Sequence, residues 1–180
     1  MRVLGLDPGS RRTGYGVVER NGNALRALAY GLVQPRARLD LPARLTEIAM
    51  RVGEVIDAHD PECVVVEEAF YHESVRSTLV LGHVRGALIV VAGQRGLPVA
   101  EYSPREIKLS VAGSGGADKA QVAFMVRRLL GLKSDLKPDA ADALAGAICH
   151  LNRARLTAPA RAASAAAERL QALLTRRGAR

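Results

Sequence analysis

The sequence predicts an α/β fold in which one five-stranded mixed sheet carries helices on both faces. Three observations favour this fold class. The first 33 residues hold three strand patterns in a row with only short turn signals between them, which is typical of antiparallel hairpins. Residues 63–66 form a continuous apolar run, as expected of a central strand buried on both faces. Behind this run, helical patterns flank one more strand, so there are enough helices to cover both sides.

The first half of the chain begins with the strand patterns, which cover residues 2–6, 13–19 and 24–33. The first of them ends at Asp7, where Pro8 and Gly9 mark a turn. Asp40 is expected to cap a helix over residues 41–59, because apolar residues recur there at helical spacing. This order predicts two hairpins followed by a helix that returns the chain to the sheet.

The second half is expected to be mostly helical. The predicted elements are a helix over residues 74–94, a strand over residues 97–102, and helices over residues 104–112, 119–130 and 139–156. Asp118 can cap one of these helices. Pro138 fits the first turn of the last helix, because its missing N–H costs nothing there.

The long helix over residues 74–94 is apolar nearly all round, so both of its sides need cover. One side is expected to lie on the sheet. Gly82 and Gly86 lie one turn apart and would permit close approach of another helix, which favours a homodimer through this helix. Cover by the chain's own C-terminal helices is an equally good explanation.

Composition indicates a soluble protein with a polyanionic partner. The net charge is +8 over 180 residues and 22 of the 26 basic residues are Arg, a residue suited to phosphate, although a bias toward Arg and Ala would give the same surplus. No apolar run approaches the roughly 18 residues of a membrane span. The chain starts directly with a strand, which leaves no room for a signal peptide. Cys63 and Cys149 lie in apolar surroundings and are expected to be buried thiols, so the cytoplasm is the expected location.

Four carboxylates lie at the ends of predicted strands or at the start of a predicted helix. Asp7 and Glu67 each end a strand, and strand ends are where sites gather in open sheets. Asp139 and Asp142 lie three residues apart, on one face of the last helix. Each acid alone has an ordinary explanation, such as a turn cap, a solvated strand end or a first-turn acid. Together they predict one acidic cluster.

Four converging carboxylates would repel one another unless cations compensate them. Two divalent metal ions cancel four negative charges, and hard oxygen ligands suit Mg²⁺ or Mn²⁺. Such a pair of ions can activate water, hold a phosphodiester and stabilise the leaving oxygen. The cluster therefore predicts metal-dependent phosphodiester hydrolysis.

Several motifs resemble the RuvC family of Holliday-junction resolvases over roughly residues 1–152. The matching segments are Leu6-Asp7-Pro8-Gly9-Ser10, Thr13-Gly14-Tyr15-Gly16, Val65-Val66-Glu67-Glu68-Ala69-Phe70, Gly82-His83-Val84-Arg85-Gly86 and Asp139-Ala140-Ala141-Asp142-Ala143-Leu144-Ala145. The resemblance implies a ribonuclease H-like fold and a homodimer with two active sites. It also implies Mg²⁺-dependent paired nicks in four-way DNA junctions during recombination and repair, beside a branch-migration helicase.

The resemblance also implies roles for single residues. The metal-binding catalytic acids correspond to Asp7, Glu67, Asp139 and Asp142, with Glu67 preferred to Glu68 because the family's acid directly follows the apolar strand. The side chain of Glu68 would also point to the opposite face of its strand.

The resemblance also implies that certain basic and aromatic residues contact DNA. Phe70 corresponds to an aromatic near the junction centre, where a base can stack on it, although core packing is a strong rival role. Lys108 and Lys119 correspond to basic residues that approach the substrate backbone; the alternative is that both are solvated. Arg76 and Arg85 are expected either to bind phosphate or to bridge the dimer.

The predicted domain organisation is a nuclease domain over residues 1–155 and a basic Ala/Arg-rich tail over residues 156–180, either helical or disordered. The tail matches no motif of the family. The alternative functions are a nuclease of the same fold acting on RNA or an RNA/DNA hybrid, and a junction-binding module without catalysis. A sugar-kinase or actin-like fold would need a second phosphate-binding hairpin and roughly twice the length.

Overall fold

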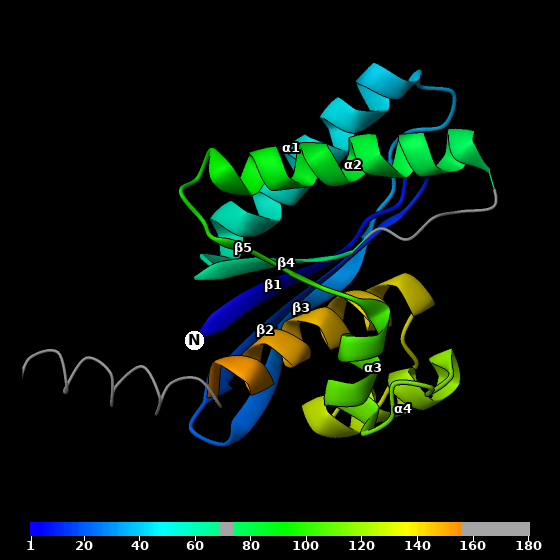
Figure 1. The fold of residues 1–180 in the computed structure, drawn as a ribbon. Helices are drawn as coiled ribbons and strands as arrows, with labels where there is room; N and C mark the ends of the chain where they lie inside the picture. Colours follow the sequence, from blue (N-terminus) through cyan, green and yellow to red (C-terminus); the bar gives the residue numbers. More distant parts are fainter. Residues whose placement is uncertain (69–73, 156–180) are drawn as a thin grey trace, which may run out of the picture.

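A computed structural model describes residues 1–68 and 74–155 of the chain. Its centre is a five-stranded sheet with the strand order β3-β2-β1-β4-β5 (Figure 1). The strands are β1 (Arg2–Asp7), β2 (Thr13–Asn21), β3 (Ala24–Val33), β4 (Cys63–Glu67) and β5 (Val99–Tyr102). Strands β1, β2 and β3 pair antiparallel, whereas β4 pairs parallel with both β1 and β5. The predicted mixed sheet is therefore confirmed.

Five helices are present in the described residues. Four are α1 (Leu41–His59), α2 (Val75–Gly93), α3 (Pro104–Ala112) and α4 (Lys119–Leu130), and a fifth helix covers residues 138–155. The side chain of Asp40 accepts a hydrogen bond from the Ala43 backbone at the start of α1. Ser103 and Asp118 form capping boxes that start α3 and α4. These caps explain why the predicted helix boundaries agree closely with the structure.

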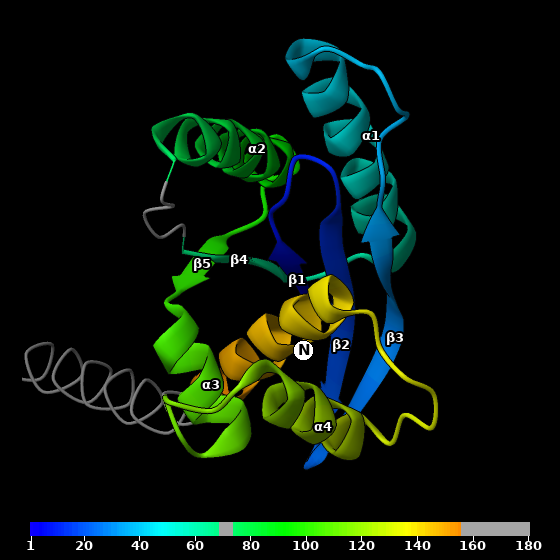
Figure 2. The ribbon, with the colours of Figure 1, turned by 90° about the vertical axis from the view of Figure 1, so that its right-hand side faces the viewer.

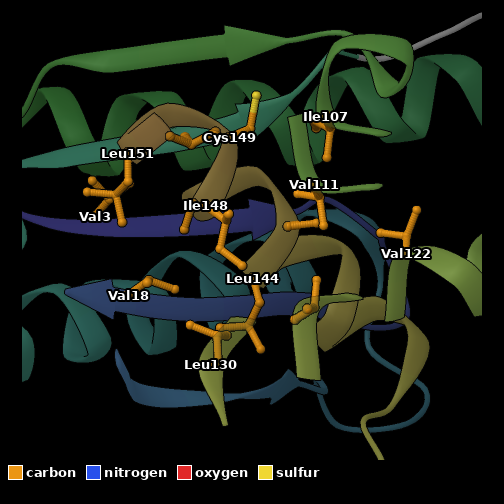
Figure 3. Packing of buried hydrophobic residues seen from close by; sticks show 14 of the residues in the cluster. Val3, Val18, Ile107, Val111, Val122, Leu130, Leu144, Ile148, Cys149 and Leu151 are labelled. Carbon is orange, nitrogen blue, oxygen red and sulfur yellow. The ribbon is translucent and has the colours of Figure 1, made fainter. Parts of the chain in front are cut away.

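The helices form two layers, with α1 and α2 on one face of the sheet and α3, α4 and the fifth helix on the other (Figure 2). Successive side chains of a strand point to opposite faces, so β1 and β4 feed both cores. Leu4 and Val64 pack toward α1 and α2. Val3 packs on the other face with Ile148 and Leu151 of the fifth helix (Figure 3). Both predictions, of two covered faces and of a fully buried β4, are confirmed.

Two strand glycines let the fifth helix lie directly on the sheet. A Cβ on Gly5 would overlap the carbonyl oxygen of Ala143, and a Cβ on Gly14 would overlap the carbonyl oxygen of Asp139. Glycine inside a strand typically marks such a close backbone approach. The absence of these side chains therefore sets how near the first turns of this helix come to β1 and β2.

Helix α2 has an apolar side that the described residues of the chain leave exposed. Val84 and Leu88 are fully buried against the sheet, but Val75 is 63%, Leu79 60% and Val90 56% exposed. By length and composition alone this helix could cross a membrane, although a single such helix is weak evidence of a span. The predicted alternative cover is wrong for the described part of the chain, because the fifth helix lies on the other face of the sheet.

The two thiols behave as predicted. Cys63 and Cys149 are both free and buried, and both belong to the core on the fifth-helix side. Figure 3 shows Cys149 in this core. Burial raises the pKa of the Cys63 thiol to about 11, so this group stays protonated and inert at neutral pH.

Candidate active site

Asp7 and Glu67 end two neighbouring parallel strands. The register pairs Leu6 with Val66, so the two acids follow at adjacent positions of β1 and β4. Side chains alternate along a strand, and Val65, two residues before Glu67, belongs to the core on the fifth-helix side. Both acids therefore point to the face that carries the fifth helix.

The fifth helix brings two more acids to this end of the sheet. Asp7 is the register partner of Gly14, and the Asp139 carbonyl group lies tight against Gly14. The first turn of the helix therefore lies over the end of β1. Asp142, one turn further along, is three residues from Asp139 and lies on the same side of the helix.

The four acids influence one another electrostatically. Burial raises the pKa of Asp7 to about 8, and the negative charges of Asp142, Glu67 and Asp139 contribute to this rise. Burial and the charge of Asp142 also raise the pKa of Glu67. Two carboxylates at strand ends are thus held in surroundings that disfavour their charged forms, and a bound cation would reverse this.

Basic side chains partly compensate the acids. The Lys119 ammonium lies 3.1 Å from the Asp142 carboxylate, and the Arg12 guanidinium lies 3.8 Å from that of Asp139. The charge of Asp142 and this hydrogen bond raise the pKa of Lys119. Lys119 and Lys108 both act to lower the pKa of Glu67, so both lysines approach the acid cluster.

The acids are near one another but are not gathered around a metal position. Among residues 1–68 and 74–155, no three His, Cys, Asp or Glu side chains lie close enough to hold one ion. Asp139 and Asp142 point to basic partners instead. Carboxylate oxygens and an excess of buried negative charge nevertheless fit a hard divalent cation. The metal-binding role of the four acids stays a prediction.

The turn that follows Asp7 is fixed by a buried threonine. Thr13 is fully buried, and its hydroxyl donates a 2.9 Å hydrogen bond to the Gly9 carbonyl group. The Gly9 N–H donates back to the same hydroxyl at 3.4 Å. A Cβ on Gly9 would overlap the Arg12 carbonyl group. Sequence reasoning assigned Thr13 no role of its own, although a Thr at the start of a strand beside a Pro-Gly turn is a signal for such a lock.

The other predicted site residues lie in different parts of the chain, and those that the structure describes are not gathered at the acidic cluster. Phe70 lies outside the described residues. Arg76 lies in the first turn of α2 and lines a surface groove beside the turn after β1. Arg85, expected to bind phosphate or bridge a dimer, has a guanidinium that forms a 2.6 Å ion pair with Glu101, and only 23% of its side chain is exposed. Glu68 is exposed, and its N–H donates to the carbonyl group of Tyr102 in β5.

Comparisons of the sequence and of the structure with known proteins lead to the same family. A family model described as crossover junction endodeoxyribonuclease RuvC matches residues 3–150. The protein of that name from Hyphomonas neptunium is 48% identical over 149 residues, which cover 83% of this chain and 89% of the relative. The one from Halorhodospira halophila is 46% identical over 168 residues, covering 93% of this chain and 99% of the relative.

A solved structure matches as well. The Thermus thermophilus RuvC structure in complex with a Holliday junction substrate has a TM-score of 0.81 and 39% identity, covering 87% of this chain and 96% of that one. This likeness confirms the predicted ribonuclease H-like arrangement of the sheet and its helices.

Proposed function

Because the chain belongs to the RuvC family of crossover junction endodeoxyribonucleases, we propose that it resolves four-way DNA junctions by paired symmetric nicks in recombination and repair. The observation that carries this proposal is the acidic cluster at the ends of β1 and β4, where the pKa of Asp7 is raised to about 8. Such a cluster matches the need of phosphodiester hydrolysis for cations, and the matched Thermus thermophilus protein is bound to a Holliday junction.

Each acid has a proposed part in the reaction. Asp7, Glu67, Asp139 and Asp142 are proposed to hold Mg²⁺ ions, two in each active site, with Mn²⁺ as a substitute. Bound there, such ions supply an activated water and stabilise the charge that develops on the phosphate. The acids keep the reacting phosphate at the end of β1, since they come from three separate elements fixed by the sheet and the fifth helix.

Basic side chains around the acids are proposed to attract and orient the substrate. Lys119 and Lys108 lie near enough to Glu67 to affect its pKa, so their charges also reach a phosphate bound there. The guanidinium group of the exposed Arg12 is 3.8 Å from the Asp139 carboxylate. When cations neutralise the acids, these three side chains are released to pair with phosphate oxygens.

The exposed side of α2 supports a homodimer. Val75, Leu79 and Val90 are large apolar side chains exposed on this helix, and Gly82 and Gly86 have open space around them. The spacing of these positions places them along one stripe of the helix. We infer that a second copy covers this stripe, which gives two active sites related by a two-fold axis, as the symmetry of a four-way junction requires.

The wider assignments follow from the same family. Residues 1–155 are proposed to be the nuclease domain and residues 156–180 a separate basic tail. The protein is proposed to act in the cytoplasm beside a branch-migration helicase complex, since a resolvase needs a junction that has been moved into place.

The decisive test is a cleavage assay on four-way junction, linear duplex and RNA/DNA hybrid substrates, first with Mg²⁺ and then with chelator. Symmetric nicks in the junction alone, abolished by chelator, are expected. Preferential cleavage of the hybrid would replace the proposal with the alternative of an RNA-processing nuclease. Tight junction binding without cleavage in Mg²⁺ or Mn²⁺ would indicate a binding module.

A further inference from the structure

A groove of about 620 Å³ lies beside the turn that follows β1. Its walls are the turn at residues 8–11, Arg44 in the first turns of α1, and the start of α2 from Arg76 to Leu81. In Figure 2 this turn, in dark blue, rises between α1 and α2. We call this hollow the arginine groove, because Arg11, Arg44 and Arg76 reach it from three separate elements.

The arginine groove carries a positive charge that none of its described lining residues compensates. No acidic side chain lines it among the described residues. Neither Arg11, Arg44 nor Arg76 forms an ion pair with a carboxylate in the part of the chain that the structure describes. The Arg44 guanidinium donates a 2.9 Å hydrogen bond to the Leu39 carbonyl group, which orients it and leaves its other N–H groups available.

The arginine groove and the acidic cluster lie at the same end of the sheet but on opposite faces. The turn after β1 separates them. Arg12 faces the cluster, where it approaches Asp139, whereas its neighbour Arg11 lines the groove. A strand of nucleic acid that leaves the acids on one side of this turn therefore meets three cations on the other side.

We propose that the arginine groove is a second nucleic-acid subsite, which binds backbone phosphates other than the phosphate that is cut. This inference rests on the proposed function and adds Arg11 and Arg44 to the substrate-binding residues. The planar guanidinium group can bind two phosphate oxygens at once, and three such groups around one hollow suit a polyanion. The described lining holds no aromatic residue, so its recognisable chemistry is that of guanidinium groups facing phosphate.

Binding at this subsite would supply affinity for DNA that the acidic cluster cannot provide by itself. The acidic cluster repels DNA until cations neutralise it, so the affinity must come from contacts elsewhere. Phosphate contacts fix the register of a protein on DNA without reading its sequence. The groove would hold the backbone across the turn from Asp7 and thereby limit which phosphate reaches the acids.

The test compares Arg11→Gln and Arg44→Gln with Arg26→Gln, each in an Asp7→Asn background. Arg26 is an exposed residue near the start of β3, at the opposite end of the sheet, so its variant changes the net charge equally. Junction affinity is measured by fluorescence anisotropy at several salt concentrations. Each groove variant is expected to bind more weakly and to reduce the slope of log K against log[salt] by about 0.9 for each phosphate that the protein no longer neutralises.

The control variant is expected to keep the original slope, and Arg44→Lys to restore part of it by keeping the charge. Melting temperatures equal to that of the Asp7→Asn parent show that the groove variants are folded. Slopes for Arg11→Gln and Arg44→Gln equal to that of Arg26→Gln would overturn the proposal. If the wild-type chain still nicks junctions in that case, only the second subsite fails, whereas absence of junction binding and cleavage removes the proposed function as well.

A cross-linking experiment locates the subsite on the DNA. Both native thiols are buried, so Arg44→Cys provides one accessible thiol for a photoreactive cross-linker. Cross-links are expected at nucleotides displaced from the nicked position in a four-way junction. A yield no higher than that of an Arg26→Cys control, or cross-links only at the nicked position, would contradict the assignment.

Discussion

The carbonyl oxygen of Asp139 occupies the space that a Cβ on Gly14 would fill. Gly14 is also the register partner of Asp7, so one glycine controls the separation between two of the four acids. A methyl group there has no flexible side chain to push aside, because its nearest neighbours are backbone atoms of the fifth helix. The close packing of Gly14 against the fifth helix therefore sets how near Asp139 lies to Asp7.

Gly14→Ala is therefore expected to displace the start of the fifth helix and remove most of the nuclease activity. The overpacking should cost about 1–3 kcal/mol of unfolding free energy, as measured by denaturant titration. Gly93→Ala, at the end of α2 with open space around it, is the matched control and should stay within about 1 kcal/mol. Full activity in the Gly14→Ala protein would show that the acids need no such close approach.

Asp7→Asn is expected to reduce cleavage to the level of the chelated wild-type protein while junction affinity changes little. The substitution removes the negative charge of the carboxylate that is coupled to the other three acids, and it leaves the basic residues in place. Cleavage rates and junction binding are measured in parallel on one four-way substrate. A variant that nicks at nearly the wild-type rate would refute the central role of this carboxylate.

The metal-free protein is expected to lose stability as the pH rises, and Asp7 is a main cause. Its pKa rises from an ordinary value of about 3.9 to about 8 in the fold, so the folded state favours the protonated form. This contribution is complete below pH of about 4 and disappears as the pH rises to about 8. Asp7→Asn should therefore melt higher than the wild type at pH 8.5 in chelator, by about 2–4 °C if the gain is about 1 kcal/mol.

Two comparisons make this pH prediction specific. The difference between the two proteins should shrink toward pH 4, and added Mg²⁺ should stabilise the wild type more than the variant. Asp57→Asn should instead melt at a lower temperature than the wild type at pH 8.5. The hydrogen bond with Arg95 lowers the pKa of Asp57, so the folded state favours the ionised carboxylate that this variant lacks. An Asp7→Asn protein that melts below the wild type at pH 8.5 in chelator would contradict the burial of an uncompensated charge.

Lys119→Met is expected to strengthen metal binding and weaken junction binding. The Lys119 ammonium lies 3.1 Å from Asp142, so it would compete with, and repel, a metal ion held by that carboxylate. Its removal should tighten Mn²⁺ binding by about fivefold, equivalent to about 1 kcal/mol. Isothermal titration with Mn²⁺ measures the first effect, and anisotropy with a four-way junction measures the second. Unchanged Mn²⁺ affinity would place the ion away from Asp142.

Leu79→Glu is expected to dissociate the proposed homodimer without unfolding the protomer. Leu79 is 60% exposed, so a charge at this position is solvated in the monomer and buried only at an interface. Sedimentation velocity measures the change in mass, and Met50→Glu, at an exposed apolar residue of α1, is the control. A dimer that survives Leu79→Glu would place the interface elsewhere. Leu88 is unsuitable for this test, because it is fully buried against the sheet.

The sequence predicts the elements of this fold well because each has local causes. Apolar periodicity and the caps at Asp40, Ser103 and Asp118 define the helices, and the apolar run of β4 identifies a central strand. The start of β5 was predicted two positions too early, because Leu97 and Pro98 continue the apolar pattern. The strand begins at Val99, and just before it the Pro98 carbonyl group accepts a 3.0 Å hydrogen bond from the Val64 N–H of β4. Such an edge is decided by pairing rather than by composition.

The site was only partly predictable, because contacts between distant segments set its details. The four acids were identified from their positions, and their mutual effect on pKa agrees with that interpretation, whereas their ligation of metal remains to be tested. The internal pairing of Arg85 with Glu101 could not be seen from local sequence. The same holds for the arginine groove, whose members belong to a turn and two different helices.

The fifth helix, which carries two of the acids, is also the last element of the described fold to be synthesised. A growing chain on the ribosome therefore holds Asp7 and Glu67 long before it holds Asp139 and Asp142. The predicted four-acid cluster is therefore completed only after all five strands of the sheet have been synthesised.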